Sequence, residues 1–315
     1  MIPDFAAVER AAERIAPYIA STPVLHSNSI DELAGAQLHF KCENFQRVGA
    51  FKFRGASNAV WSLDANVAQR GVVTHSSGNH GAALALAART RGIAAHVIVP
   101  EGAVPSKVIA IAAFGANVHR CAPTQAAREA MAFEVAASTG ATMIHPYTNR
   151  DVIAGQGTAA LELIREHGPF DTIVAPIGGG GLLCGTAIVA RALLPNASVH
   201  GAEPMGADDA ARSLAAGTRV DNFTPDTICD GLRALLGEIN FTMLQQMKVS
   251  VLTISDAETI TAMRLIFERL KIIVEPSCAI VLAAVFKHRE VFAGKRVGLI
   301  LSGGNVDLDR LPWQT

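Results

Sequence analysis

Lys52 and three glycine-rich turns are the residues of this chain whose types and order could do chemistry. A lysine kept in apolar surroundings has a lowered pKa, and its amine can form a Schiff base with an aldehyde. The turns, each of which follows an apolar, strand-like run, are Ser76–Gly81, Gly178–Gly181 and Ser302–Asn305. Backbone amides that open a helix among glycines can hold a phosphate. The order of these motifs therefore predicts a phosphorylated cofactor that is bound to the lysine.

The neighbours of Lys52 decide between this interpretation and an ordinary solvated lysine. Phe51 and Phe53 flank it, and the alternation predicts a short strand that ends at Gly55. In such a strand either Lys52 or the two phenylalanines face the interior. An inward-facing lysine in an apolar pocket is the form that Schiff-base chemistry requires.

Each glycine-rich turn also has a plainer interpretation. The four glycines could be a flexible loop, the turn 76–81 an N-cap, and the turn 302–305 a strand end. The four glycines match neither a dinucleotide fingerprint nor a P-loop, so a phosphate monoester is the better ligand. The turn 76–81 offers hydroxyls, an amide and an imidazole to a carboxylate, and the Ser302 hydroxyl could meet a ring nitrogen.

The composition predicts a soluble, cytoplasmic α/β protein. The chain has 315 residues, half of them apolar, and a net charge of −1 from 27 basic and 28 acidic residues. Because these charges are mixed, we expect no nucleic-acid partner, and we expect no signal peptide and no membrane span. The five cysteines are odd in number and form no C-x-x-C pair, which predicts free, mostly buried thiols.

Strand-like and helix-like segments alternate along the chain. The expected strands are 71–74, 95–99, 117–120, 171–175, 198–202 and 296–301, and the expected helices are 82–90, 107–114, 126–135 and 182–194. Alternation of this kind favours right-handed βαβ units and a mostly parallel sheet that is covered on both faces.

Two polar connectors, residues 62–70 and 145–151, suggest a division into domains. The compact unit between them has the size of a small domain. We predict a large, discontinuous domain of residues 1–68 and 147–315, with a small substrate-clamping domain of residues 69–146 inserted in it. A single open sheet is the alternative.

Together, the four motifs resemble those of the fold-type II pyridoxal-phosphate enzymes, specifically the serine/threonine dehydratase and serine racemase branch. The resemblance covers essentially the whole chain. The segment Ala50–Ala56 is similar to the Schiff-base lysine segment of that branch, whereas the Ser-x-Lys-Asp-Arg pattern of the sulfhydrylase branch is absent. The resemblance implies a tryptophan synthase β-like fold with two α/β/α domains, a homodimer, and pyridoxal 5'-phosphate as the cofactor.

The resemblance also implies how the cofactor is held. Lys52 would bind it as a Schiff base, Phe51 would stack on its ring, and Asn79 would bond its 3-hydroxyl. Ser302 would meet the ring nitrogen, which need not stay protonated, so that prompt loss of a β-leaving group is favoured. The phosphate would be held by Gly178, Gly179, Gly180 and Gly181.

The reaction implied is elimination from a small β-hydroxy amino acid. Lys52 would take the Cα proton, and L-serine, L-threonine or 3-hydroxyaspartate would become a 2-oxo acid and ammonia. The alternative is a serine or aspartate-type racemase with Lys52 and Ser77 as the two bases, although Ser77 could only bond the substrate carboxylate. Tyr147 and Ala234 depart from the mammalian-type racemase pattern and favour the dehydratase.

Further residues are assigned to the substrate by the same resemblance. Arg128 matches an arginine of the racemase pocket and could receive a second carboxylate; a surface position on its helix is the plainer interpretation. The other expected substrate-binding residues are Ser76, Ser77, Asn79 and His80.

A divalent-metal site is also implied. Glu203, Ala207 and Asp209 are similar to the metal-binding residues of this branch and suit Mg²⁺, Ca²⁺ or Mn²⁺, whereas a polar turn with a helix cap is the plainer interpretation. Ala82 and Phe114 replace the glutamine and tyrosine of the racemases' nucleotide site, which puts nucleotide activation in doubt. The chain stops soon after Ser302, so we expect no regulatory domain and no feedback by isoleucine.

Two rival classes remain. A nicotinamide oxidoreductase would share the fold class but lacks the fingerprint and leaves Lys52 without a role. An amino-acid-binding sensor could use the same scaffold without catalysis. A yellow colour of the purified protein would separate the pyridoxal-phosphate enzyme from both.

Overall fold

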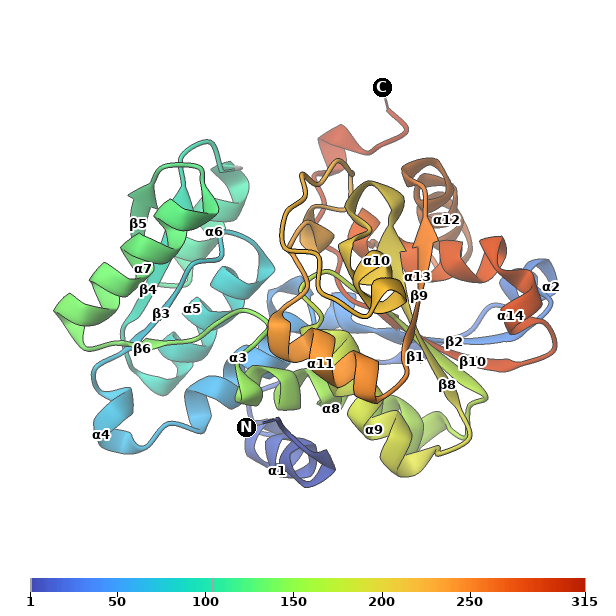
Figure 1. Cartoon of the computed structure of the whole chain (residues 1–315), viewed down its shortest axis with the longest axis horizontal. Helices are drawn as coiled ribbons and strands as arrows, with labels where there is room; N and C mark the ends of the chain where they lie inside the picture. The colour runs from blue at the N-terminus through green and yellow to red at the C-terminus, as the bar shows by residue number, and fades with distance from the viewer. Residues whose placement is uncertain (1, 104, 315) are drawn as a thin grey trace.

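The chain folds around two sheets that lie side by side (Figure 1). The structure, a computed structural model, describes residues 2–103 and 105–314. The larger sheet has six strands in the order β1-β2-β10-β7-β8-β9, and the smaller has four in the order β5-β4-β3-β6. Neighbouring strands run parallel, except that β1 is antiparallel to β2. The parallel α/β architecture expected from the alternating segments is therefore confirmed.

The larger sheet is covered on both faces. Its strands are β1 (Val24–Leu25), β2 (Gln37–Cys42), β7 (Thr172–Pro176), β8 (Ser198–Pro204), β9 (Ser250–Ile254) and β10 (Arg296–Leu301). The helices of this part are α1 (Phe5–Ile15), α2 (Asn28–Ala34), α3 (Lys52–Trp61), α8 (Arg150–His167), α9 (Gly181–Leu193), α10 (Asp209–Ala216), α11 (Glu238–Gln246), α12 (Asp256–Arg269), α13 (Pro276–Lys287) and α14 (Arg289–Phe292).

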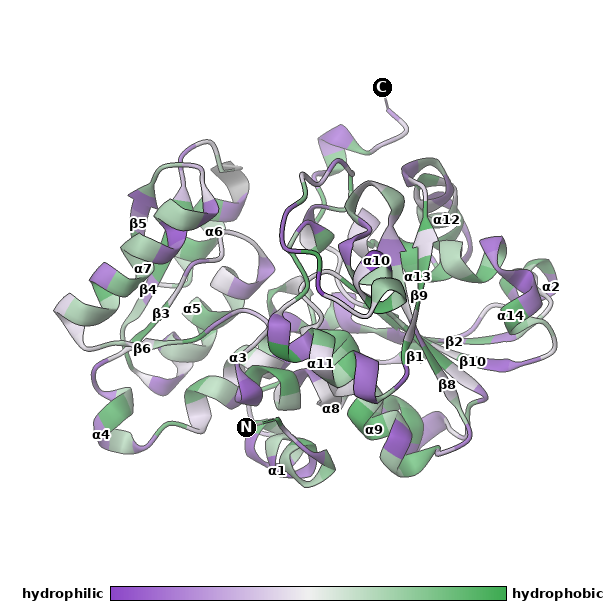
Figure 2. Cartoon of the chain, viewed as in Figure 1, coloured by the Kyte–Doolittle hydropathy of each residue, from purple (hydrophilic) through white to green (hydrophobic). Residues whose placement is uncertain are grey.

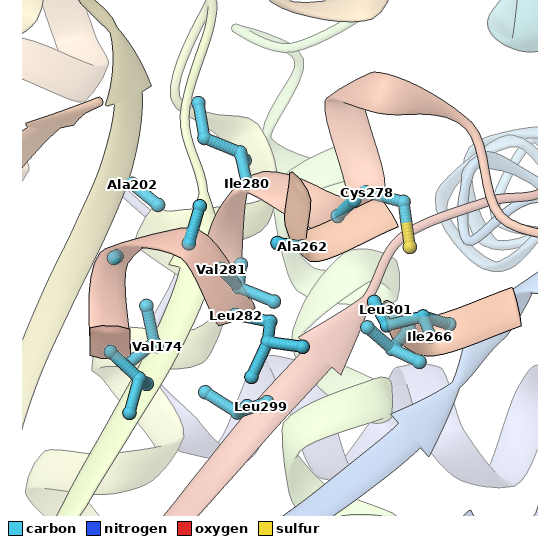
Figure 3. Packing of buried hydrophobic residues seen from close by; sticks show 14 of the residues in the cluster. Val174, Ala202, Ala262, Ile266, Cys278, Ile280, Val281, Leu282, Leu299 and Leu301 are labelled. Carbon is cyan, nitrogen blue, oxygen red and sulfur yellow. The ribbon is translucent and has the colours of Figure 1, made fainter. Parts of the chain in front are cut away.

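Successive residues of the central strands enter two different cores, because side chains alternate across a sheet. Leu299 of β10 packs with α12 and α13 in one core, while Ile300 joins α8 and α9 in the other. Figure 3 shows the first core, in which Val281 and Leu282 of α13 lie over the strands. Burial on both faces explains why these strands read as continuous apolar runs.

The smaller sheet is built from one continuous stretch of the chain. Its strands are β3 (Val72–Thr74), β4 (Ala95–Pro100), β5 (Asn117–Cys121) and β6 (Thr142–Met143), and its helices are α5 (Asn79–Arg91), α6 (Pro105–Ala113) and α7 (Gln125–Thr139), with α4 (Ala65–Ala68) before them. Alanines of α5 pack on one face of the sheet, and α7 packs on the other. The outer helices α7 and α11 carry both hydrophobic and hydrophilic residues (Figure 2).

The expected strands and helices appear with ends shifted by up to four residues, with one exception. The strand expected around Lys52 is wrong, because Lys52 is the first residue of α3. Three residues of alternation are too short to outweigh the packing of α3 against α5 and α8. The inward side chain is that of Phe53, which is fully buried, while Phe51 and Lys52 are half-buried.

Two expectations drawn from composition can be compared with the structure. All five cysteines are free and buried, as predicted. Among the described helices, none combines the length and the apolar character that crossing a membrane requires.

Candidate active site

Lys52 lies where the larger sheet presents the carboxyl ends of its parallel strands. The backbone before it is anchored to the end of β10, since the Phe51 amide donates to the Ser302 carbonyl at 2.9 Å and Ala50 bridges Gly303. The Lys52 Nζ donates to the Pro146 carbonyl at 3.2 Å and lies 5.1 Å from the centre of the Phe51 ring.

The amine of Lys52 is tuned by two opposing effects. Burial lowers its pKa from 10.5 to about 8, and the negative charge of Glu275 partly opposes this shift. A neutral amine is therefore accessible near neutral pH, which is the state that adds to an aldehyde or accepts a proton.

The loop of residues 178–181 has a geometry that only glycines allow. Gly180 has a φ of +94°, and α9 begins at the next residue without a side-chain cap. A Cβ added to Gly179 would lie 2.4 to 2.5 Å from ring atoms of Tyr147. The loop thus brings bare backbone amides to the positive end of α9, which fits a phosphate.

Tyr147 connects the lysine to this loop. Pro146, whose carbonyl accepts the hydrogen bond from Lys52, is the residue before it. Asn240 donates to the carbonyls of both Tyr147 and Gly179, and so fixes the tyrosine backbone against the glycines. Lys52, the glycine loop and the end of β10 are therefore parts of one site.

Asn79 reaches the same site from the smaller sheet. Its Nδ2 donates to the two carboxylate oxygens of Glu275 at 3.1 and 3.3 Å. The Asn305 Nδ2 donates to the Asn79 Oδ1 at 3.0 Å. Both amide atoms are oriented, so that Asn79 is held at the junction of the two sheets.

Glu275 is a residue of this site that none of the sequence motifs predicted. It is 3% exposed, and burial, with a smaller effect of Asp230, raises its pKa to about 7. A signal existed, because a single acidic residue stands between Val274 and Pro276 at the start of an apolar helix, and proline favours the first helical turn. The negative charge of the Glu275 carboxylate raises the pKa of Lys52 and so opposes the effect of burial.

Three imidazoles near Lys52 are neutral at physiological pH. Burial lowers the pKa of His145 to about 4 and that of His80 well below its ordinary value, and it also lowers the pKa of His75. The positive charge of Lys52 adds to the shifts of His80 and His145. These rings therefore shape the site without adding positive charge to it.

The expected substrate-binding residues occupy different depths. Ser76 and Ser77 are half-buried in the turn before α5, and the turn is tight because a Cβ on Gly81 would lie 2.0 Å from the Ser76 carbonyl oxygen. His80 is fully buried, and neither ring nitrogen has a hydrogen-bond partner among the described residues.

Arg128 projects from the first turns of α7. The side chain is half-buried, and its Nε is buried with no hydrogen-bond partner in the described part of the chain. Its charge acts on the pKa of His75 and of Tyr147. It is therefore oriented toward the residues that surround Lys52 and the glycine loop.

Glu203, the last residue but one of β8, lies beside Asp209, the first residue of α10, and the buried Ala207 stands between them in sequence. The Glu203 oxygens accept from the Ala210 and Ala211 amides at 2.9 and 2.8 Å. The Asp209 Oδ1 is buried without a partner in the described residues. Burial raises the pKa of Glu203 to about 8 and that of Asp209 to about 6. Two buried carboxyl groups with a free oxygen fit a divalent cation.

A buried ion network supports the start of α3. Arg54 is fully buried, and its Nε donates to Glu43 at 2.7 Å while its Nη1 donates to Glu162 at 2.6 Å. Lys41, also fully buried, pairs with Glu162 at 2.7 Å. Local sequence patterns do not predict this network, since its members are far apart in the chain.

Comparison with known proteins agrees with this geometry. A family model described as "Pyridoxal-phosphate dependent enzyme" matches residues 15–303. The β-hydroxyaspartate dehydratase of Paracoccus denitrificans (strain Pd 1222) is 47% identical over 312 residues, which are 99% of each chain. The serine racemase of Dictyostelium discoideum is 47% identical over 309 residues, 96% of this chain and 95% of that one. The structure of maize serine racemase has a TM-score of 0.96 and 44% identity, and covers 98% of this chain and 95% of its own.

Proposed function

Because the chain belongs to the fold-type II pyridoxal-phosphate-dependent enzymes, we propose that it eliminates water from a small β-hydroxy amino acid, and that water then hydrolyses the released enamine and frees the amino group. The products are a 2-oxo acid and ammonia. The observation that carries this proposal is the half-buried Lys52, whose amine has its pKa lowered to about 8, beside the glycine loop.

Pyridoxal phosphate, when bound, supplies an electron sink that makes the Cα proton of the substrate acidic. Lys52 would hold the cofactor, and its neutral amine would accept the Cα proton. The glycine loop would bind the phosphate through backbone amides at the start of α9. Asn79, which Glu275 and Asn305 orient, would bond the cofactor 3-hydroxyl, and Phe51 and Ser302 would contact its ring.

Among β-hydroxy amino acids, we propose 3-hydroxyaspartate as the preferred substrate. It carries a second carboxylate, and the half-buried Arg128 has an unpaired Nε near Tyr147. A guanidinium with free donors suits a carboxylate. The relative from Paracoccus denitrificans is named a β-hydroxyaspartate dehydratase, which supports this assignment. L-serine and L-threonine lack that carboxylate and would be poorer substrates.

Racemisation is the second candidate function, and Ser77 favours it. Its hydroxyl lies in the half-buried turn before α5, where it could return a proton to Cα while Lys52 acts as the other base. The similarity to serine racemases supports this candidate. In Ser77→Ala, racemisation should be lost while elimination is retained.

One assay tests the function and the substrate together. The holoenzyme is incubated with L-serine, D-serine, L-threonine and the diastereomers of 3-hydroxyaspartate, and both keto acid and enantiomer are measured. We expect keto acid with the highest kcat/KM for one 3-hydroxyaspartate isomer. Arg128→Gln should remove that preference and leave L-serine turnover nearly unchanged. An absence of keto acid from every substrate would refute the elimination.

We further propose that Glu203, Asp209 and the Ala207 carbonyl bind Mg²⁺, with Ca²⁺ or Mn²⁺ as alternatives. Treatment with EDTA should lower the melting temperature, and Mg²⁺ should restore it. At a Mg²⁺ concentration of a hundred times Kd, binding should add about 2.7 kcal/mol to the unfolding free energy. Asp209→Asn should abolish this response. Asp208→Asn, which changes the partly exposed neighbour, is the matched control and should keep it. An identical response in both variants would contradict the site.

The domain boundaries, assembly and location remain proposals. Residues 69–146 act as the small substrate-clamping domain on the large domain of residues 1–68 and 147–315. The protein works as a homodimer in the cytoplasm, where its free buried cysteines are compatible with reducing conditions. Light scattering of the purified holoenzyme tests the dimer.

A further inference from the structure

Three histidines from separate elements meet at the larger sheet, on the side away from the glycine loop. His26 directly follows β1, His39 lies in the first half of β2, and His167 ends α8. One ring nitrogen of each lies within 4.8 Å of those of the other two. His39 pairs in register with Gly298 near the start of β10, whereas Ser302 and the site of Lys52 follow the end of that strand.

His39 is the fixed member of this cluster. It is 7% exposed, and its ring packs edge-on against Phe170 with centroids 5.1 Å apart. The His26 ring packs on it at 4.2 Å and an interplanar angle of 85°. The His39 Nδ1 is buried and has no hydrogen-bond partner among the described residues, which is unusual for a buried polar atom.

We propose that His26, His39 and His167 bind a divalent first-row transition-metal ion of the Zn²⁺ class. Imidazole nitrogen is a preferred ligand of these ions, and three histidines with one water complete a tetrahedral set. Zn–N bonds of about 2.0–2.1 Å place the ligand nitrogens about 3.4 Å apart. His26 is exposed and His167 half-buried, so rotation of these two side chains can close the set on His39.

Charged neighbours set limits on the affinity. The Arg296 guanidinium acts on the His39 pKa and would repel a cation, although it lies over the Phe170 ring and its Nη2 donates to the His167 carbonyl. A Glu166 carboxylate oxygen lies 3.9 Å from the His167 Nε2 and offers compensating charge. The bound ion would join the edge strand β1 to the end of α8. It would therefore stabilise the larger sheet. It would not act on turnover, because Lys52 lies at the other end of the parallel strands.

Zinc titration of the holoenzyme against a chromophoric chelator tests the proposal, with excess Mg²⁺ present to occupy oxygen ligands. We expect one Zn²⁺ per chain, and a loss of at least about tenfold in affinity in His26→Gln and in His167→Gln. His119→Gln is the matched control, since it removes one imidazole of the separate His96–His119 pair, and its affinity should equal that of the unchanged chain.

The same variants should differ in thermal unfolding. Zn²⁺ should raise the melting temperature of the unchanged chain and of His119→Gln, but not that of the double variant His26→Gln/His167→Gln. Because His26 is exposed and far from the site of Lys52, its replacement should leave kcat unchanged, which shows that the variant is folded. Equal zinc affinity in the double variant and the unchanged chain would overturn the proposal, as would a loss confined to His119→Gln.

Discussion

At the scale of single residues, the reactivity of Lys52 depends on the balance between its burial and the charge of Glu275. Burial alone would depress the pKa of the amine further, and the carboxylate limits the shift. Glu275 is in turn held by Asn79, so three residues from separate segments set one proton equilibrium.

The first prediction concerns the pH dependence of cofactor binding. Only the neutral amine adds to an aldehyde, and the pKa of Lys52 in the cofactor-free protein is about 8. The rate of association of pyridoxal phosphate should therefore rise about tenfold per pH unit below this value and level off above it. Stopped-flow absorbance of the cofactor measures this rate.

Glu275→Gln provides the matched variant for that experiment. The substitution removes the charge that raises the Lys52 pKa and keeps a group of similar shape beside Asn79. The midpoint of the pH profile should move to lower pH. A midpoint that stays in place, or moves upward, would show that Glu275 does not act on the amine.

At the scale of elements, the glycine loop and the start of α9 form a site that tolerates no side chain at Gly179, the second residue of the loop. The Tyr147 ring occupies the space that a Cβ on Gly179 would need. We expect Gly179→Ala to lower the affinity for pyridoxal phosphate by at least about tenfold, because a steric shift would move the amides that bind the phosphate. Equilibrium titration of the cofactor measures this loss.

The steric cause can be separated from a general effect of the substitution. If the clash with the Tyr147 ring is responsible, the double variant Gly179→Ala/Tyr147→Ala should bind the cofactor as well as Tyr147→Ala alone. Additive losses in the double variant would instead indicate that the two residues act independently.

The buried ion network is the second feature at this scale. Glu43→Gln leaves the buried cations Arg54 and Lys41 to share the single charge of Glu162, and this excess of buried positive charge should cost about 3–5 kcal/mol of unfolding free energy. The control Glu9→Gln removes an exposed pair with Arg165, with side chains 40% and 52% exposed, and should cost less than about 1 kcal/mol. Urea unfolding measures both, and similar losses would mean that the buried network does not stabilise α3.

Sequence patterns predicted those elements whose signals are local. The strands at 95–99 and 296–301 and the glycine loop at 178–181 follow from short apolar runs and glycine chemistry. The prediction of a strand around Lys52 was wrong, because the packing of this segment against α5 and α8, which are distant in sequence, favours a helix. Arg54, Glu43 and Glu275 were missed for the same reason, since their partners are brought together only by the fold.

At the scale of the whole molecule, polar contacts join the two sheets at the edge of the site. Asn79 of α5 bonds Glu275 and Asn305, and Lys107 of α6 forms an ion pair with Asp230. The ion pair is partly exposed, with side chains 28% and 40% accessible, so its contribution is small and sensitive to salt.

Lys107→Met should therefore weaken the contact between the parts of the chain that carry the smaller and the larger sheet, on either side of the substrate. We expect KM to rise by up to about fivefold at low ionic strength, corresponding to about 1 kcal/mol, and the difference to vanish in high salt. Lys287→Met is the matched control, because it removes a pair of similar exposure within the larger part, with side chains 29% and 39% accessible. A KM effect of the same size in the control would contradict a role in joining the units.

The central claim is that Lys52 is the residue to which the cofactor is bonded. Borohydride reduction of the holoenzyme, followed by peptide mass spectrometry, fixes the cofactor to its amine and locates it. We predict a single phosphopyridoxyl group, on the peptide that contains Lys52, and none in Lys52→Ala. A label on another lysine, or no label in a protein that still turns over substrate, would contradict the account.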